Sequence, residues 1–167
     1  MAAGLYFVKT SLSAFESVYR RRYASFARVA LAITRDPDSA AEAVQEAFAR
    51  TIRSRTRFRG RGSLEAWIWR AVVNEAKRLA AAPAAVALAG TEASTNGAPG
   101  EESDVRALIA ALPERQRLAV FLRYYADLDY RTVGDVLEIE TGTVSATLAA
   151  AHRTLRAGME GVSHEPR

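Results

Sequence analysis

The chain has 167 residues, of which 49% are hydrophobic, enough for one packed domain or two small ones. It has no cysteine and only two histidines, so disulfide frameworks, thiolate metal sites and histidine-rich metal clusters are excluded. Residues 1–80 contain 15 Lys or Arg and 7 Asp or Glu, a net charge of +8, whereas residues 104–167 carry a net charge of −1. A basic N-terminal half favours a polyanionic partner, and nucleic acid is the polyanion expected.

No active site, cofactor or metal site is predicted, so we do not expect an enzyme. No stretch approaches the roughly 20 apolar residues that a membrane span requires, and no basic residues precede the short apolar run in residues 1–8. We therefore expect a cytoplasmic protein with no membrane partner and no small-molecule substrate.

Two amphipathic helices that pack antiparallel are predicted in the first 52 residues. The first carries an apolar stripe from Phe15 to Ile33 and ends at Asp36-Pro37, because proline disfavours helix in the residue before it. Ser39 and Glu42 have the spacing of a capping box for the second helix. The apolar face predicted behind it consists of Val44, Ala47, Phe48, Thr51 and Ile52.

A basic loop and an aromatic helix follow. From Arg53 to Arg61 an arginine occupies every second position, and Gly60 interrupts helical order. Binding of a single DNA strand requires cations that follow phosphates and flat side chains that stack on bases. Phe58 and Trp69 are the predicted stacking platforms; the alternative is a solvated basic surface. Ser63 is the predicted cap of a third helix, with an apolar stripe of Leu64, Trp67, Ile68, Ala71, Val72 and Leu79.

Residues 81–103 have the Ala, Gly, Pro, Ser and Thr content of a flexible linker, which is long enough to let two domains sit at separate places on a partner. We therefore predict an all-α protein of two small helical domains, residues 1–80 and 104–167.

The second domain has helix-turn-helix spacing. Its first helix places Val105, Leu108, Ile109 and Leu112 on one face. Pro113 suits the first position of the next helix, whose predicted inward residues are Leu118, Phe121, Leu122 and Tyr125. Asp129 is the expected cap of a short helix over residues 130–137. A longer helix is expected from Thr141, with Val144, Leu148, Ala151 and Leu155 inward.

Four segments in this half, ALPERQR (111–117), LRYY (122–125), LDY (128–130) and GTV (142–144), resemble the promoter-reading domain of bacterial RNA polymerase sigma factors. The extracytoplasmic-function group of the sigma-70-type family is the most similar. The N-terminal half also resembles the family. Residues 15–23 and 41–48 are similar to its polymerase-binding helices, and residues 58–74 to the loop and helix that hold the minus-ten element open. The resemblance covers about 120 of the 167 residues.

The resemblance implies a transcription initiation factor that binds core RNA polymerase and promoter DNA, melts the minus-ten element, and has an anti-sigma protein as a further partner. The implied polymerase-binding residues are Glu42, Gln45, Glu46, Phe48 and Arg50. The implied and predicted contacts to the unpaired minus-ten strand are Arg57, Phe58, Arg59, Arg61, Ser63, Trp69, Arg70, Asn74, Lys77 and Arg78. The implied helix-turn-helix contacts are Arg131, Thr141, Thr143, Ser145, Thr147, His152 and Arg153.

The expected recognition helix departs from the family, because alanines and short polar residues stand where long basic or polar side chains are usual. Glu138 also replaces the usual glycine of the turn, where a left-handed residue costs roughly 1 kcal/mol. These departures favour a rival interpretation, a sigma-like adaptor or decoy that binds proteins and reads no promoter with its C-terminal domain. A free-standing helix-turn-helix repressor would leave the N-terminal resemblance unexplained.

Overall fold

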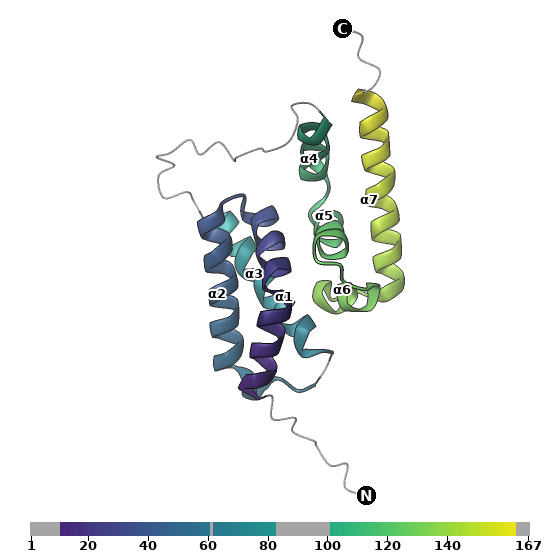
Figure 1. Cartoon of the computed structure of the whole chain (residues 1–167). Coiled ribbons are helices and arrows are strands. Elements are labelled where there is room, and N and C mark those ends of the chain that lie inside the picture. Colours follow the sequence, from purple (N-terminus) through teal and green to yellow (C-terminus); the bar gives the residue numbers. More distant parts are fainter. Residues whose placement is uncertain (1–10, 61, 83–100, 163–167) are drawn as a thin grey trace, which may run out of the picture.

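The structure, a computed structural model, describes residues 11–60, 62–82 and 101–162, and its helices form two groups (Figure 1). The N-terminal domain consists of α1 (Leu12–Thr34), α2 (Pro37–Arg53), the 3-10 helix η1 (Arg55–Arg57) and α3 (Leu64–Ala81). The C-terminal domain consists of α4 (Glu101–Ala111), α5 (Glu114–Val120), the π-helix η2 (Phe121–Tyr125), α6 (Tyr130–Leu137) and α7 (Thr141–Val162). The predicted all-α fold of two small domains is confirmed. None of these helices is long and apolar enough to cross a membrane.

Helices α1 and α2 run antiparallel, as predicted, and meet at a tight turn (Figure 1). Arg35 ends α1 in the left-handed conformation, with φ of 60°. Asp36 then caps α2, because its side chain accepts a 2.8 Å hydrogen bond from the Ser39 N–H. Pro37 occupies the first helical position, where its missing N–H costs nothing. The capping box predicted at Ser39 and Glu42 is therefore wrong by three residues: Ser39 already lies inside the helix.

The core of the N-terminal domain lies where α3 packs against α1 and α2. The ring centroid of Trp69 is 4.3 Å from that of Phe26, which in turn lies 5.4 Å from Phe48. Helix α3 also packs against α6 of the other domain, so α3 is in contact with helices of both domains. The buried stripe of α3 is consequently shifted from the predicted one. Its apolar members are Ala66, Ile68, Trp69, Val72, Val73 and Ala76.

Two local features of the C-terminal domain differ from expectation. Pro113 is the residue that precedes α5 rather than its first residue, since its ψ of 142° is extended. In η2 the Ala126 N–H donates to the carbonyl oxygen of Phe121, five residues earlier, at 3.2 Å. This wider turn rotates the residues within it relative to an α-helix. Tyr125, predicted to point inward, is therefore 39% exposed, whereas Leu122 is buried as expected.

Helix α6 covers the predicted residues, and α7 begins at Thr141 as predicted. Asp129 caps α6 by accepting a 2.7 Å hydrogen bond from the Thr132 N–H, which lowers the pKa of this carboxyl. Glu138 makes the turn in the left-handed conformation, with φ of 58° and ψ of 44°. Gly134 lies so close to the turn that a Cβ there would be 2.7 Å from the carbonyl oxygen of Ile139. Helix α7 follows, burying Val144, Leu148 and Ala151 as predicted.

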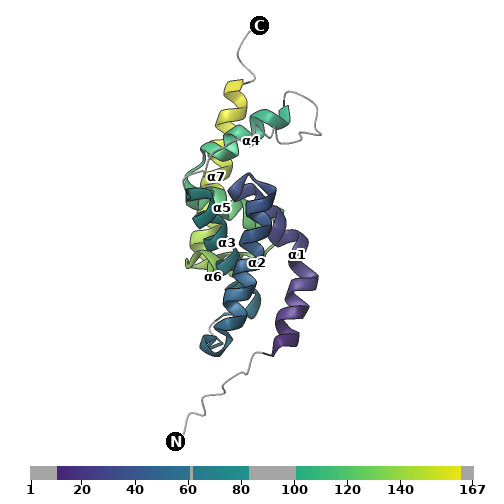
Figure 2. The ribbon, with the colours of Figure 1, turned by 90° about the vertical axis from the view of Figure 1, so that its left-hand side faces the viewer.

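The two domains pack against each other, with α6 against α3 and η2 against α1. Figure 1 shows α5 and α6 beside the N-terminal helices, and Figure 2 shows the same arrangement after a quarter turn. The separate placement allowed by the linker composition is therefore not the arrangement in this structure. Most of the predicted linker, residues 83–100, lies outside the described residues.

Candidate nucleic-acid interface

The first two arginines of the alternating series are tied to the end of α2. Arg53 lies in α2 and forms a 3.0 Å ion pair with Glu46. Arg55 begins η1 and donates a 3.1 Å hydrogen bond to the carbonyl oxygen of Ile52. These contacts hold the start of the basic segment against the helix rather than leaving it extended.

The next arginines lie on an exposed turn that leads into α3. Arg57 and Arg59 are exposed. Gly60 and Gly62 have φ of 69° and 76°, a region that glycine adopts without steric cost. Arg61, which the sequence also predicts to bind the single strand, lies outside the described residues. The described turn thus presents two cations to solvent.

An aromatic pair adjoins this turn. The ring centroids of Phe58 and Trp67 are 5.4 Å apart, and those of Trp67 and Phe15 are 6.3 Å apart in a T-shaped arrangement. Both members of the pair are partly exposed. The prediction that Trp69 is a stacking platform is wrong, and Trp67, predicted to be a core residue, is only partly buried against the edge of the core. Trp69 is fully buried, because its side of α3 faces α1 and α2.

The remaining predicted residues of this surface lie on α3. Ser63 caps the helix as predicted, accepting a 3.0 Å hydrogen bond from the Ala66 N–H. Asn74 and Lys77 are exposed and Arg70 is half-buried. The guanidinium of Arg70 and the ammonium of Lys77 both contact acidic residues of the C-terminal domain. The sequence gives no signal of these contacts, since they join residues more than 35 positions apart.

A buried carboxylate lies beneath two other arginines of the N-terminal domain. Glu75 is buried and forms ion pairs with Arg50 of α2 at 2.5 Å and with Arg78 of α3 at 2.8 Å. The hydrogen bond to Glu75 raises the pKa of Arg78. Glu75 therefore fixes the direction of one predicted DNA-binding arginine and one predicted polymerase-binding arginine. Sequence reasoning missed this role, although the three-residue spacing of Glu75 and Arg78 is a signal of an ion pair.

The predicted polymerase-binding residues of α2 divide between surface and core. Glu42 and Gln45 are exposed, while Glu46 pairs with Arg53 and, at 3.9 Å, with Arg50. Phe48 does not belong to the surface. It is buried in the aromatic core, because it points toward α1.

The side of α7 that carries the predicted promoter contacts presents short side chains. Thr141, Thr143 and Ser145 are exposed, as are Arg131 on α6 and Arg153 further along α7. The hydroxyl of Thr147 already donates to the carbonyl oxygen of Thr143 at 2.7 Å. His152 shares a 2.9 Å hydrogen bond with the hydroxyl of Tyr124. Few long donors therefore remain on this helix.

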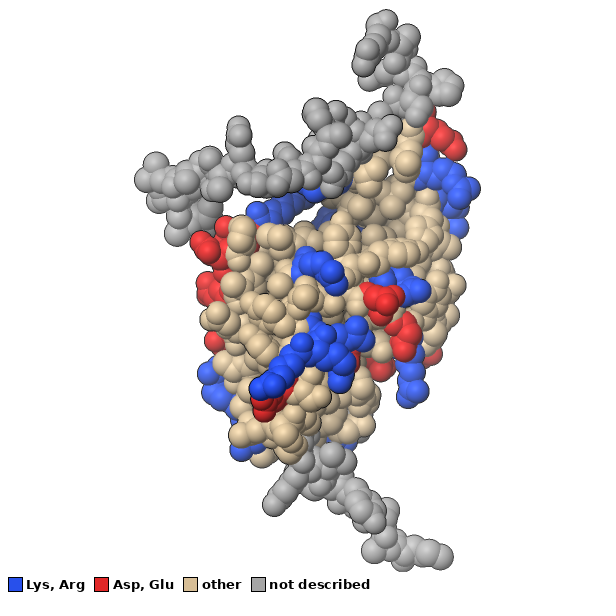
Figure 3. Space-filling model, viewed as in Figure 1, with Lys and Arg blue, Asp and Glu red and all other residues tan. Residues whose placement is uncertain are grey.

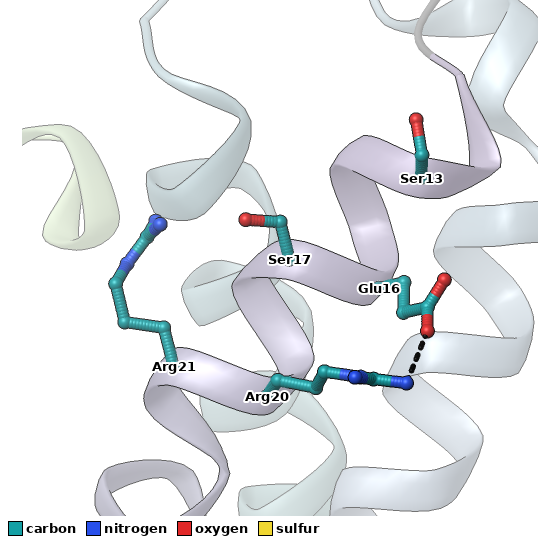
Figure 4. Close-up of a pocket in the computed structure, with 5 residues that line it drawn as sticks. All are labelled: Ser13, Glu16, Ser17, Arg20 and Arg21. Carbon is teal, nitrogen blue, oxygen red and sulfur yellow. Dashed lines mark ion pairs between the residues drawn. The ribbon is translucent and has the colours of Figure 1, made fainter.

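The charged surface is broken into small areas. Figure 3 shows the basic side chains of one face as separate groups, several of them beside acidic side chains. A shallow hollow on the outer side of α1 illustrates this (Figure 4). There Arg20 pairs with Glu16 at 2.7 Å, and Arg21 is held by Glu65 of α3 at 3.1 Å. Because all its lining residues come from one helix, the hollow is an open surface.

Two family profiles match the chain: Sigma-70 region 2 over residues 18–82 and Sigma-70 region 4 over residues 103–155. The chain belongs to the sigma-70 family. Members of this family are transcription initiation factors that direct RNA polymerase to promoters, and the predicted function of this sigma factor is confirmed at that level. They act by binding rather than by catalysis.

Two solved structures share the fold of both domains of this sigma factor. CnrH, solved in complex with the cytosolic domain of CnrY, is 18% identical with a TM-score of 0.70, and the match covers 90% of each chain. The sigma factor RpoE of Bartonella quintana, co-crystallised with the anti-sigma factor NepR, is 16% identical with a TM-score of 0.64. That match covers 89% of this chain and 98% of RpoE.

Proposed function

We propose that this sigma factor is of the extracytoplasmic-function group and holds the unpaired strand of the minus-ten element on its N-terminal domain. The observation that carries the proposal is the partly exposed pair of Phe58 and Trp67, beside the exposed Arg57 and Arg59. Stacking on an aromatic ring contributes ~1–3 kcal/mol per base. A separated strand exposes base faces that a duplex hides, so this surface binds the melted state better than the duplex.

The loop of residues 57–63 is the proposed receiving place for a base turned out of the strand. The exposed Arg57 and Arg59 are the proposed contacts to the phosphates on either side of that base, and Gly60 has open space where a side chain would be. Turning out a base costs a few kcal/mol of lost stacking and pairing. Stacking on Phe58 or Trp67 and phosphate contacts offset that cost.

Salt dependence tests the arginines. Replacing Arg57 and Arg59 with alanine should reduce the slope of log affinity against log salt on a single strand by about 1.4, since each phosphate contact contributes about 0.7. Adding Arg61→Ala should extend the reduction to about 2. The control, Arg20→Ala with Arg28→Ala, removes two charges from α1 and should leave the slope unchanged. An unchanged slope in the loop variants would assign these arginines to a solvated surface.

Core polymerase is proposed to bind the exposed side of α2. Charge reversal at Glu42 should weaken capture of this protein by core polymerase and leave the helical content unchanged. Glu42 is a cleaner choice than Glu46, because reversal at Glu46 also releases Arg50 and Arg53. Glu16→Lys on α1 is the control. Wild-type protein that is not retained by core polymerase would contradict the proposal at its first step.

A second candidate function is the sigma-like adaptor or decoy, which reads no promoter with its C-terminal domain. The small side chains of Ser145, Ala146 and Ala149 on α7, all exposed, favour it. Run-off transcription with core polymerase on a library of genomic fragments separates the two functions. Initiation at particular sites supports the sigma factor, and retained polymerase binding without initiation supports the adaptor.

We further propose that an anti-sigma protein regulates this factor, because RpoE, which shares its fold, was solved with one. The protein then acts in the cytoplasm, where polymerase and DNA are found, and functions by binding alone.

A further inference from the structure

The predicted DNA-binding side of α3 is covered by the C-terminal domain. One guanidinium nitrogen of Arg70 pairs with the carboxylate of Glu138 at 3.1 Å, and the other donates to the carbonyl oxygen of Asp135. Seven residues further along α3, about two helical turns, Lys77 pairs with Glu114 at the start of α5. Thus two of the cations assigned to the minus-ten strand are bound by acidic residues of the same chain.

A cleft of about 400 Å³ separates the two helical surfaces between these ion pairs. Arg70, Asn74 and Lys77 line it from α3, and Glu114, Arg115 and Glu138 line it from the other domain. Asn74, a third predicted contact to DNA, therefore faces the C-terminal domain across the cleft. A DNA strand lying along this side of α3 would occupy the volume that α5 and α6 now border.

Glu138 lies at the left-handed turn that ends α6, where its backbone N–H donates to the carbonyl oxygen of Gly134. Glycine would make the same turn without steric cost, whereas this position carries a carboxylate. The strained position directs a carboxylate across the domain boundary to Arg70. At the other ion pair, the hydrogen bond from Lys77 lowers the pKa of Glu114.

We propose that Glu114 and Glu138 hold the C-terminal domain over the DNA-facing side of α3, and that the two domains must separate before promoter DNA can bind there. The inference rests on the proposed binding of the minus-ten strand and on the contacts to that strand predicted from the sequence for Arg70, Asn74 and Lys77. Phosphates and these two carboxylates compete for the same cations, so DNA itself favours opening. The ion pairs are partly exposed, with Glu138 70% and Glu114 53% accessible, and salt weakens them.

Because the chain has no cysteine, two engineered cysteines can carry spin labels at defined sites. Asp38→Cys at the start of α2 and Ala157→Cys on α7 are exposed and lie in different domains. The distance distribution between these labels should be narrow in the full-length protein at low salt. Exposed ion pairs shift an equilibrium by about two- to fivefold each, so Glu114→Gln with Glu138→Gln should raise the open fraction roughly tenfold.

The control is Asp127→Asn with Glu140→Gln, which removes the same charge from exposed positions of the same domain. It should leave the distance distribution as in the wild type, because neither residue has an ion pair to α3 within the described part of the chain. A double variant Glu114→Gln, Glu138→Gln that is as closed as the wild type would overturn the proposal.

Binding of a single-stranded oligonucleotide to the same unlabelled full-length proteins completes the test. The double variant Glu114→Gln, Glu138→Gln should bind this oligonucleotide up to tenfold more tightly than the control variant does. If the double variant opens but binds the oligonucleotide no more tightly than the control variant, the C-terminal domain does not cover the DNA-binding surface and the proposal is overturned. If no form of the protein binds the strand although the labels show opening, the proposed function fails, while the ion-paired closure stands on the distance measurement alone.

Discussion

Replacing the two tryptophans one at a time should separate DNA binding from folding. Trp69 is fully buried against Phe26, so Trp69→Ala leaves a cavity and should lower the free energy of unfolding by about 3–5 kcal/mol. That is a large part of the roughly 5–15 kcal/mol that stabilises a typical domain. Trp67 is only partly buried, against Phe58 and Phe15, and its replacement should cost less than about 2 kcal/mol.

For DNA binding we expect the opposite order, with the larger loss in the Trp67→Ala variant. Loss of one stacked base corresponds to ~1–3 kcal/mol, so Trp67→Ala should weaken binding of a single strand roughly 5- to 150-fold. Fluorescence provides the assay, because these are the only two tryptophans in the chain. In a Trp69→Phe variant the remaining emission comes from Trp67 and should be quenched as the strand is added. In a Trp67→Phe variant it comes from the buried Trp69 and should hardly change.

Two outcomes would refute this reasoning. If Trp67→Ala binds the strand as tightly as the wild type, the aromatic pair is no stacking platform. If Trp69→Ala unfolds at the same urea concentration as the wild type, the packing of Trp69 against Phe26 does not stabilise the domain as expected for a fully buried aromatic residue.

Three further predictions concern the C-terminal domain. Asp129→Ala should lower the free energy of unfolding by about 1 kcal/mol at pH 7, because the Thr132 N–H loses its acceptor. This difference should disappear as the pH falls through the lowered pKa of Asp129, since protonation removes the same stabilisation from the wild type; urea titrations at several pH values would show it. Gly134→Ala should lower the thermal midpoint, measured by circular dichroism, by an amount equivalent to about 1–3 kcal/mol, because its Cβ would lie 2.7 Å from a backbone oxygen of the turn. Ser145→Lys with Thr147→Arg should raise affinity for duplex DNA in mobility-shift titrations; tight, sequence-selective binding by the wild type would show that small side chains suffice.

Much of the helical framework could be predicted because its signals are local. Helix ends depend on a few neighbouring residues, and the caps Ser63 and Asp129 and the start of α7 at Thr141 are where the sequence predicts them. The misplaced cap of α2 shows the limit of this reasoning. Asp36 and Ser39 both satisfy the rules for a cap, and the choice of Asp36 places Pro37 at the first helical position. The sigma-family motifs are likewise properties of the chain alone.

Which face of a helix is buried was decided only by the tertiary structure. The stripes of Trp67 and Trp69 are both plausible from spacing, and packing of α3 against three other helices selects Trp69 for the core. The π-turn in η2, which exposes Tyr125, is a second case. Contacts between residues distant in sequence are a third, because Arg70 and Glu138 look like ordinary surface charges until the fold brings them within 3.1 Å. Charge and periodicity are local properties, whereas the partner of a side chain depends on how the whole chain folds.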